Sequence, residues 1–286
     1  MQDPFVNDRH GPDRAHGGFP QVDKSSQHLQ RLPRSIFQFL TDLVMGLSRQ
    51  KEQRLDIIVN NAAELATPYL ETKEGISNHM VINHIGHFVF VTTLLPLLEK
   101  TANLQGSDVR IVTVFLEAHA QIIGAKVTFD SVESSNVQSQ SKLKLARYLH
   151  VLYGVSKLAS ILMTRELQRR FNKQEIPIIC LSLHPGQLAL LSAGENKKIF
   201  GSDIAWFPSK SAYLFAMKPD KGVLTLLFAA TDPSVKKKSA IYGGAYLVPY
   251  EQVQKRSFLS NDMKLANTCG YSGEGSQGEV RDVGGI

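Results

Sequence analysis

Three short apolar runs alternate with two long helical patterns in the middle of the chain. The runs LDIIVN (55–60), VRIVTVF (109–115) and PIICLSL (177–183) are rich in β-branched residues, as in strands buried on both faces. Between them, residues 75–100 and 146–173 carry apolar positions at helical spacing. This alternation predicts an α/β fold of the Rossmann-like, doubly wound type, in which helices cover both faces of a parallel sheet.

The same patterning divides the chain into three segments. Residues 1–34 are rich in Gly, Pro, Asp, His and Gln without any period, and we expect an irregular lead-in. Ser35 is a candidate N-cap for a further helix, whose apolar positions recur up to Leu47. We expect a single domain over residues 35–250 and an irregular tail over residues 251–286.

Composition narrows the class of protein. At 286 residues and 43% hydrophobic, the chain is globular, and its net charge of +6 is scattered apart from one Lys-Lys-Lys run at 236–238. Without a recognised binding motif, this charge predicts no nucleic-acid partner. Two cysteines, Cys180 and Cys269, favour a reducing compartment, and we expect a cytoplasmic protein. The apolar stretch FVFVTTLLPLL is shorter than the ~20 residues of a membrane span, so no span is expected.

The stretch YGVSK places Tyr153 and Lys157 four residues apart, on one face of the predicted helix. Such spacing is also common between ordinary helix residues, so other segments must decide whether the pair has a chemical role. The segments NNAAE, FLEAHA and HPGQLAL follow the three predicted strands. Ligands of doubly wound sheets bind at the carboxyl ends of the strands, which directs attention to these three segments.

Four separated segments together resemble the short-chain dehydrogenase/reductase family. LDIIVNNAA is similar to the family's strand with Asn-Asn-Ala-Gly, VINHIGHF to its central-helix asparagine segment, YGVSK to its Tyr-x-x-x-Lys motif and LHPG to its Pro-Gly turn. NHIGHF and the later GGAYLVP resemble the retinol-dehydrogenase-like branch. The resemblance covers roughly residues 35–250. It implies an NAD(P)-dependent oxidoreductase acting on an alcohol or carbonyl of a small or lipid-like molecule.

The resemblance assigns roles to three residues. Tyr153 would exchange a proton with the substrate, and because a free tyrosine has a pKa of about 10, it needs help near neutral pH. The ammonium of Lys157 would lower that pKa by favouring the phenolate, and would also hold the cofactor ribose. Asn83 would hold a water next to Lys157, although a polar residue at a helix kink explains Asn83 equally well.

The resemblance also implies a cofactor, NADP or NAD, and a homodimer. The dimer would form through the two long helices, with Phe88, Leu95, Leu162 and Leu167 as candidate contacts. The substrate wall would be KKIFGSDIAWFPSKSAYLF with Trp206, a stretch that also suits a helix packed on the sheet. The implied cofactor-binding residues are Asn60, Tyr153, Lys157, Pro185, Gly186 and Leu188.

Three neighbouring histidines raise the question of a metal. His84 and His87 share a helix face and His79 lies nearby, but no acidic or cysteine ligand stands close in the sequence. Zinc sites usually use three or four ligands, so we expect no metal site.

The chain departs from the family pattern at its amino end. Upstream of Ser35 nothing resembles the Gly-rich turn that brings backbone N–H groups and a helix end to the pyrophosphate. About 60 residues precede Asn60, whereas we expect nearer 90 at ≈30 or more residues per βαβ unit. We therefore expect the first βα units to be incomplete.

Further departures lie at the predicted site. Phe115 and Leu116 stand where the related branch has a pair of serines, and the resemblance implies that the later one, replaced by Leu116, binds the substrate carbonyl. Leu190 replaces a threonine, and Ala63 replaces a glycine. Two hypotheses therefore stay open. The chain is either an NAD(P)-dependent oxidoreductase, or a catalytically impaired relative (a pseudoenzyme) that acts as a binding or dimerisation partner. The atypical ends are consistent with an altered gene reading or with genuine drift.

Overall fold

The core of the protein is one sheet of five strands in the order β1-β2-β3-β4-β5. The first four strands run parallel and β5 pairs antiparallel with β4. The strands are β1 (Ile57–Asn60), β2 (Val109–Val114), β3 (Ile178–Leu183), β4 (Tyr246–Val248) and β5 (Gln252–Val253). The computed structural model describes residues 52–64, 70–73, 75–115, 127–129, 145–186, 219–254 and 262–268.

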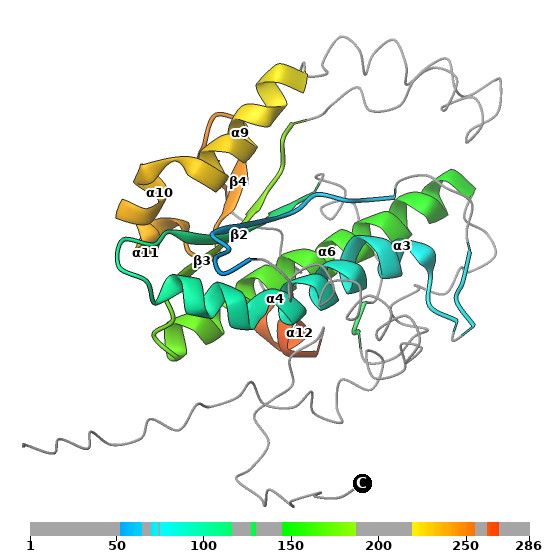
Figure 1. Ribbon diagram of the computed structural model, residues 1–286. Helices are drawn as coiled ribbons and strands as arrows, with labels where there is room; N and C mark the ends of the chain where they lie inside the picture. The colour runs from blue at the N-terminus through cyan, green and yellow to red at the C-terminus, as the bar shows by residue number, and fades with distance from the viewer. Residues whose placement is uncertain are drawn as a thin grey trace, which may run out of the picture.

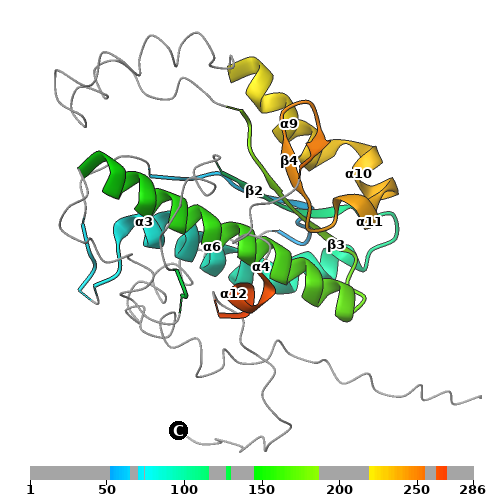
Figure 2. The same cartoon turned by 180° about the vertical axis from the view of Figure 1, so that it is seen from behind.

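Helices cover both faces of this sheet. Figures 1 and 2 show α3, α4, α6 and α12 on one side of the strands and α9, α10 and α11 on the other. The predicted doubly wound α/β fold is thereby confirmed, and the predicted strands and long helices agree with the observed ones to within about three residues. The helices are α3 (Asn78–Met80), the π-helical turn η1 (Val81–Ile85), α4 (Gly86–Ala102), α6 (Leu145–Lys173), α9 (Pro219–Thr231), α10 (Pro233–Lys237), α11 (Ser239–Tyr242) and α12 (Met263–Thr268).

Strand register explains why β2 and β3 show no polar alternation. Ile111 of β2 pairs with Cys180 of β3, and both belong to the apolar core under α4 and α6. Val112 pairs with Leu181, and both pack with Phe228 of α9 in a second apolar cluster on the opposite face. Every residue of these two strands is buried, as the sequence pattern predicted.

Strand β1 differs from that expectation. Ile57 and Val59 are 36% and 39% exposed, although the sequence predicted a strand buried on both faces. Val59 pairs with Val112 and so shares the face that α9 covers. Since α9 contacts β2 and β3, this face of β1 stays open among the described residues.

Arg110 lies inside a run that is otherwise apolar. Its guanidinium is buried, and it donates two hydrogen bonds to the Asp108 carboxylate (2.9 and 2.6 Å). It also donates to the carbonyls of Ala229 (2.9 Å) and Asp232 (2.7 Å), at the end of α9. Arg110 therefore joins β2 to the carboxyl end of α9, where helix carbonyls lack partners of their own.

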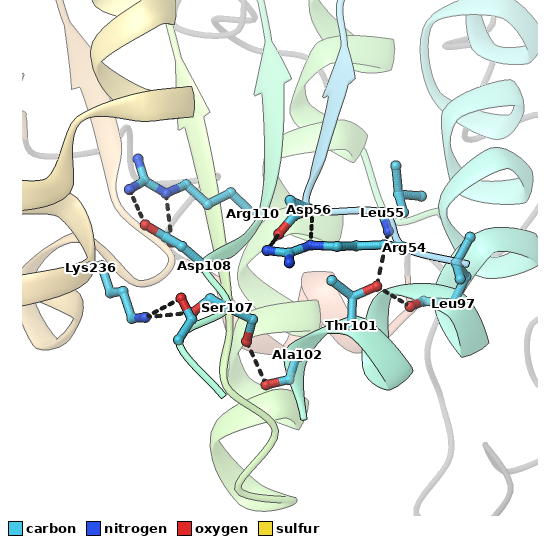
Figure 3. A network of polar contacts seen from close by, with 11 residues as sticks. Arg54, Leu55, Asp56, Leu97, Thr101, Ala102, Ser107, Asp108, Arg110 and Lys236 are labelled. Carbon is cyan, nitrogen blue, oxygen red and sulfur yellow. Dashed lines mark hydrogen bonds and ion pairs between the residues drawn. The ribbon is translucent and has the colours of Figure 1, made fainter. Parts of the chain in front are cut away.

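Other polar contacts tie the amino ends of the strands to neighbouring segments (Figure 3). The backbone N–H of Leu55 donates to Thr101 Oγ1 (2.9 Å), which anchors the segment before β1 to the end of α4. The Lys236 ammonium donates to the carbonyl of Ser107, which joins α10 to the turn before β2. These contacts lie at the amino ends of the strands, and the predicted site lies at their carboxyl ends.

The segment after residue 250 was expected to be irregular. It contains β5, which pairs with β4, and α12, which packs on α6. Leu265 and Ala266 of α12 are buried in the apolar core beside α6. The expected boundary at residue 250 therefore divides elements that pack together. Tertiary contacts define these elements, and a six-residue helix leaves little periodicity in the sequence.

Two sequence expectations concern the long helices α4 and α6. The helix Asn78–Ala102 has 25 residues and a mean hydropathy of 1.6, so by length and composition it could cross a membrane. Of its most apolar stretch of 18 residues, 56% is buried within the chain. A buried helix in the core of a protein has the same apolar composition. The proposed dimer contacts are also buried in the core and were wrong as surface positions, while the dimer itself stays a prediction. These contacts are Phe88, Leu95, Leu162 and Leu167.

Candidate active site

Tyr153 and Lys157 lie together on α6 at the carboxyl end of β2. Both side chains are buried, and Lys157 Nζ lies 5.6 Å from the centroid of the Tyr153 ring, within the range of a cation–π contact. The same nitrogen donates to the carbonyl of Val114, the last residue of β2, at 3.3 Å. The structure thus brings the predicted pair together at the predicted edge of the sheet.

Burial changes the acidity of Lys157. Because the charged form is poorly solvated there, the pKa of Lys157 falls to about 8. At pH 7 the side chain is still mainly an ammonium. An ammonium has three donors, and among the described residues Lys157 uses one of them, in the contact with Val114. Lys157 therefore keeps donors for a further acceptor, such as a hydroxyl group.

Asn83 lies in the π-helical turn η1 and ties it to two other elements. Its amide oxygen accepts from the backbone N–H of Glu64 (2.6 Å), and its amide nitrogen donates to the Glu64 carbonyl (3.0 Å) and to Ser156 Oγ (3.1 Å). Ser156 directly precedes Lys157, so Asn83 is brought to the predicted pair. The main-chain carbonyl of Asn83 accepts from Ser160 Oγ (3.0 Å), and the water-holding role of Asn83 stays a prediction.

A line of buried hydroxyl groups on α6 extends this network. Ser156, Ser160 and Thr164 recur every four residues, so they share one helix face. Thr164 Oγ1 donates to Thr113 Oγ1 of β2 at 3.2 Å, while Ser160 contacts the carbonyl of Asn83. Sequence analysis missed this line, although three hydroxyl residues at helical spacing beside the YGVSK motif were a visible signal.

The predicted cofactor residues follow β1 and β3. Asn60 ends β1, is buried and donates to Thr113 Oγ1 (3.5 Å). Within the part of the chain that the structure describes, its amide oxygen has no hydrogen-bond partner. Pro185 and Gly186 follow β3, and Gly186 has a φ of +100°, which favours glycine. Several predicted positions lie outside the described residues: Leu116, Leu188, Leu190, Trp206 and the helix expected after Ser35.

These groups fit one end of a nicotinamide dinucleotide. Lys157 offers donors to a ribose, Asn60 offers a buried amide oxygen, and Gly186 permits close approach of the backbone. The described residues contain no Gly-rich turn that would hold the pyrophosphate. The fit therefore concerns the ribose and nicotinamide.

Phe115 directly follows β2, at the first position of the serine pair that the family resemblance implies. Its ring is buried and stacks on Tyr246 of β4, with centroids 5.1 Å apart and an interplanar angle of 20°. A phenyl ring has no hydrogen-bond donor for a substrate carbonyl. This contact explains how β2 and β4 accommodate the large side chain at that position.

The three histidines are all buried. Burial, followed by the charge of Lys157, lowers the pKa of His87 to about 4. Burial also lowers the pKa of His79, against the opposing charge of Glu64. Among the described residues, no three His, Cys, Asp or Glu side chains gather as a metal site would require.

Sequence comparison identifies relatives of known class. The chain is 41% identical over 212 residues to a short-chain dehydrogenase/reductase of Armillaria gallica, covering 73% of this chain and 63% of the relative. It is 34% identical over 203 residues to the short chain dehydrogenase/reductase dpchH of Colletotrichum higginsianum, covering 69% and 48%. Human retinol dehydrogenase 14 is 29% identical over 241 residues, covering 82% and 62%. The chain thus spans less than two thirds of the length of each of these relatives.

The solved structures that match the chain are less similar to it in sequence. A protein from Mycobacterium paratuberculosis is 24% identical with a TM-score of 0.49, covering 80% of this chain and 69% of that one. NADPH-bound carbonyl reductase from chicken fatty liver is 19% identical with a TM-score of 0.47, covering 77% and 73%. No family model matches the chain. On the similarity to these curated relatives, the chain belongs to the short-chain dehydrogenase/reductase family.

Proposed function

We propose that the chain carries the proton-transfer half of an NAD(P)-dependent oxidoreductase that acts on an alcohol or carbonyl of a small or lipid-like molecule. One observation carries the proposal. Tyr153 and Lys157 lie together, buried, at the carboxyl end of β2, with the ammonium 5.6 Å from the tyrosine ring. Ligands of doubly wound sheets bind at this edge. The curated relatives are named as dehydrogenases and reductases.

In the reducing direction, the bound nicotinamide would supply a hydride to the carbonyl carbon. Tyr153 would donate its phenolic proton to the carbonyl oxygen, which completes the alcohol and leaves a phenolate. The Lys157 ammonium, buried beside the ring, would stabilise that phenolate and return a proton to it. Asn83 would hold α6 and the π turn in register through Ser156. Oxidation of an alcohol would run the same proton steps in reverse.

A second proposal follows from Leu116 and Phe115. The resemblance implies the carbonyl-binding serine at the position of Leu116, whose side chain has no hydrogen-bond donor, and the preceding Phe115 is buried and stacks on Tyr246; both departures favour a catalytically impaired relative that binds a partner. In this proposal a homodimer forms through η1 and α4, with Ile82 (41% exposed) and Phe90 (37% exposed) as surface contacts. Sedimentation measures the oligomeric state of the chain and of an Ile82→Asp variant. A dimer that Ile82→Asp dissociates would support this contact, and a monomeric chain would contradict it. Cell fractionation tests the proposed cytoplasmic location.

Cofactor titration distinguishes the two proposals. NADPH and NADH would be titrated calorimetrically into the chain, into Lys157→Met and into the control Lys100→Met, whose exposed ammonium contacts Gln53. The oxidoreductase proposal expects binding that Lys157→Met weakens and Lys100→Met leaves unchanged. Equal affinities in all three proteins would support the binding-partner proposal instead.

A further inference from the structure

The line of hydroxyl groups on α6 extends beyond the pair that is proposed to transfer the proton. Thr164 lies about two helix turns after Lys157. It is buried, and its hydroxyl donates to the Ser160 carbonyl of its own helix (2.9 Å) and contacts Thr113 Oγ1 of β2 (3.2 Å). Thr113 is buried as well. The two hydroxyl groups therefore join α6 to β2 away from the groups that exchange the proton.

The third member of this contact is Asn60, the last residue of β1. The strand register places Asn60 beside Thr113. Both side chains lie on the face under α4 and α6, because Ile58 and Ile111, two residues earlier in each strand, belong to the apolar core on that face. The amide nitrogen of Asn60 donates to Thr113 Oγ1 at 3.5 Å. Thr113 thus connects the end of β1 to α6.

The same helix fastens the chain again four residues later. The backbone N–H and carbonyl of Glu64 both bond to the amide of Asn83 (2.6 and 3.0 Å), and this amide donates to Ser156 Oγ of α6 (3.1 Å). Segment 60–64 is therefore tied to α6 at both ends, whereas residues 61–63 between the ends are exposed.

Segment 60–64 lies where a ligand of this sheet would bind. It begins at the carboxyl end of β1, and ligands of doubly wound sheets bind at that edge. A backbone that is already ordered binds a ligand more tightly, because its conformational entropy is not lost on binding. Tyr153 and Lys157 belong to the helix that fastens both ends. One rigid element therefore holds the proposed proton pair and the exposed segment in a fixed relation.

We propose that Thr113 and Thr164 are positioning residues, which hold segment 60–64 through Asn60 in the conformation that binds the cofactor. Neither hydroxyl needs to touch the cofactor for this role. The inference rests on the proposed function, because the order of segment 60–64 matters for turnover only where a cofactor binds beside it.

Four variants separate the hydroxyl contact from other effects. Thr113→Val and Thr164→Val each remove one hydroxyl and keep a branched side chain of similar size. Thr164→Ser keeps the hydroxyl and removes only a methyl group. The matched control is Thr92→Val on α4, because the Thr92 hydroxyl donates to the Phe88 and Val89 carbonyls of its own helix.

Backbone NMR of the full chain tests the positioning without cofactor or turnover. The order parameters of the amides of residues 61–63 would be measured in the wild type and in the four variants. We expect values near the rigid level of about 0.85 in the wild type, in Thr164→Ser and in Thr92→Val. In Thr113→Val and Thr164→Val they should fall below about 0.6, the level of a flexible backbone. Wild-type order parameters in both valine variants would overturn the proposal.

Kinetics test whether this order serves the cofactor. In a protein with Tyr153-dependent turnover, Thr164→Val should raise the KM for NADPH about tenfold with little change in kcat, and Thr164→Ser should restore it. A purely structural role would lower the active fraction, and so kcat, and leave KM unchanged; that result would contradict the inference. If one valine variant does not fold, the other gives the same decision, since both open the same contact. If Tyr153→Phe leaves turnover unchanged, the proposed function fails, while the order parameters still decide whether the hydroxyls hold the segment.

Discussion

Replacing Arg110 with methionine tests how the sheet is tied to α9. Methionine keeps an apolar stem in the buried site but removes the guanidinium that donates to the carbonyls of Ala229 and Asp232. Each hydrogen bond to a charged donor contributes about 1.5–3 kcal/mol. The side chain of Asp108 is 31% exposed, so water can replace part of what it loses. We expect Arg110→Met to lower the free energy of unfolding by about 3–5 kcal/mol, as for other broken buried ion pairs.

Urea unfolding followed by circular dichroism would measure this loss. The matched control is Lys236→Met at the same sheet edge, because its exposed ammonium also donates to backbone carbonyls. Exposed contacts contribute little, and we expect a change below about 1 kcal/mol there. In thermal unfolding, Arg110→Met should lower Tm by about 6–12 °C. If Arg110→Met and Lys236→Met lose the same amount of stability, the inferred role of Arg110 is wrong.

Three further predictions concern acidity and the site. The pKa of His87 is about 4 in the folded chain and 6.5 when free, so the unfolded chain binds more protons between these values. Stability should therefore rise with pH across that window, by about 3 kcal/mol, and His87→Gln should flatten the rise in urea titrations at several pH values. Leu116→Ser alone should not restore turnover in an NADPH oxidation assay, because weak cofactor binding remains limiting. Glu166→Gln should lower the free energy of unfolding by about 1–3 kcal/mol in urea, because buried Glu166 pairs with Arg169 and Arg170. An unchanged midpoint in Glu166→Gln would refute the last prediction.

The sequence predicted those parts of the fold that depend on local pattern. The runs that form β1, β2 and β3, and the long helices between them, have a composition and period that each segment carries by itself. The pairing of Tyr153 with Lys157 is also local, since four residues make one helix turn. These features could be read before any contact between distant segments was known.

The remaining features depend on contacts between distant segments. The π turn around Asn83 is held by Glu64, 19 residues away, and by Ser156, 73 residues away. Arg110 is buried because carbonyls 119 and 122 residues later accept its hydrogen bonds. A sequence pattern within one segment contains no information about such partners. For the same reason, the apolar helix faces suggested a dimer surface where the structure has an internal core.

The most direct test of the account is NADPH-dependent reduction of a carbonyl at millimolar NADPH, comparing the chain with Tyr153→Phe. Tyr242→Phe serves as the control, since Tyr242 packs on Phe228 on the other face of the sheet. Because the sequence upstream of Ser35 has no Gly-rich turn, we expect a Kd for NADPH of about 1 mM or higher. We expect a rate about 10²–10³ lower than that of an enzyme that keeps the serine, because Leu116 replaces it. The account predicts slow NADPH oxidation that Tyr153→Phe abolishes and Tyr242→Phe retains. Oxidation that continues unchanged in Tyr153→Phe would contradict it.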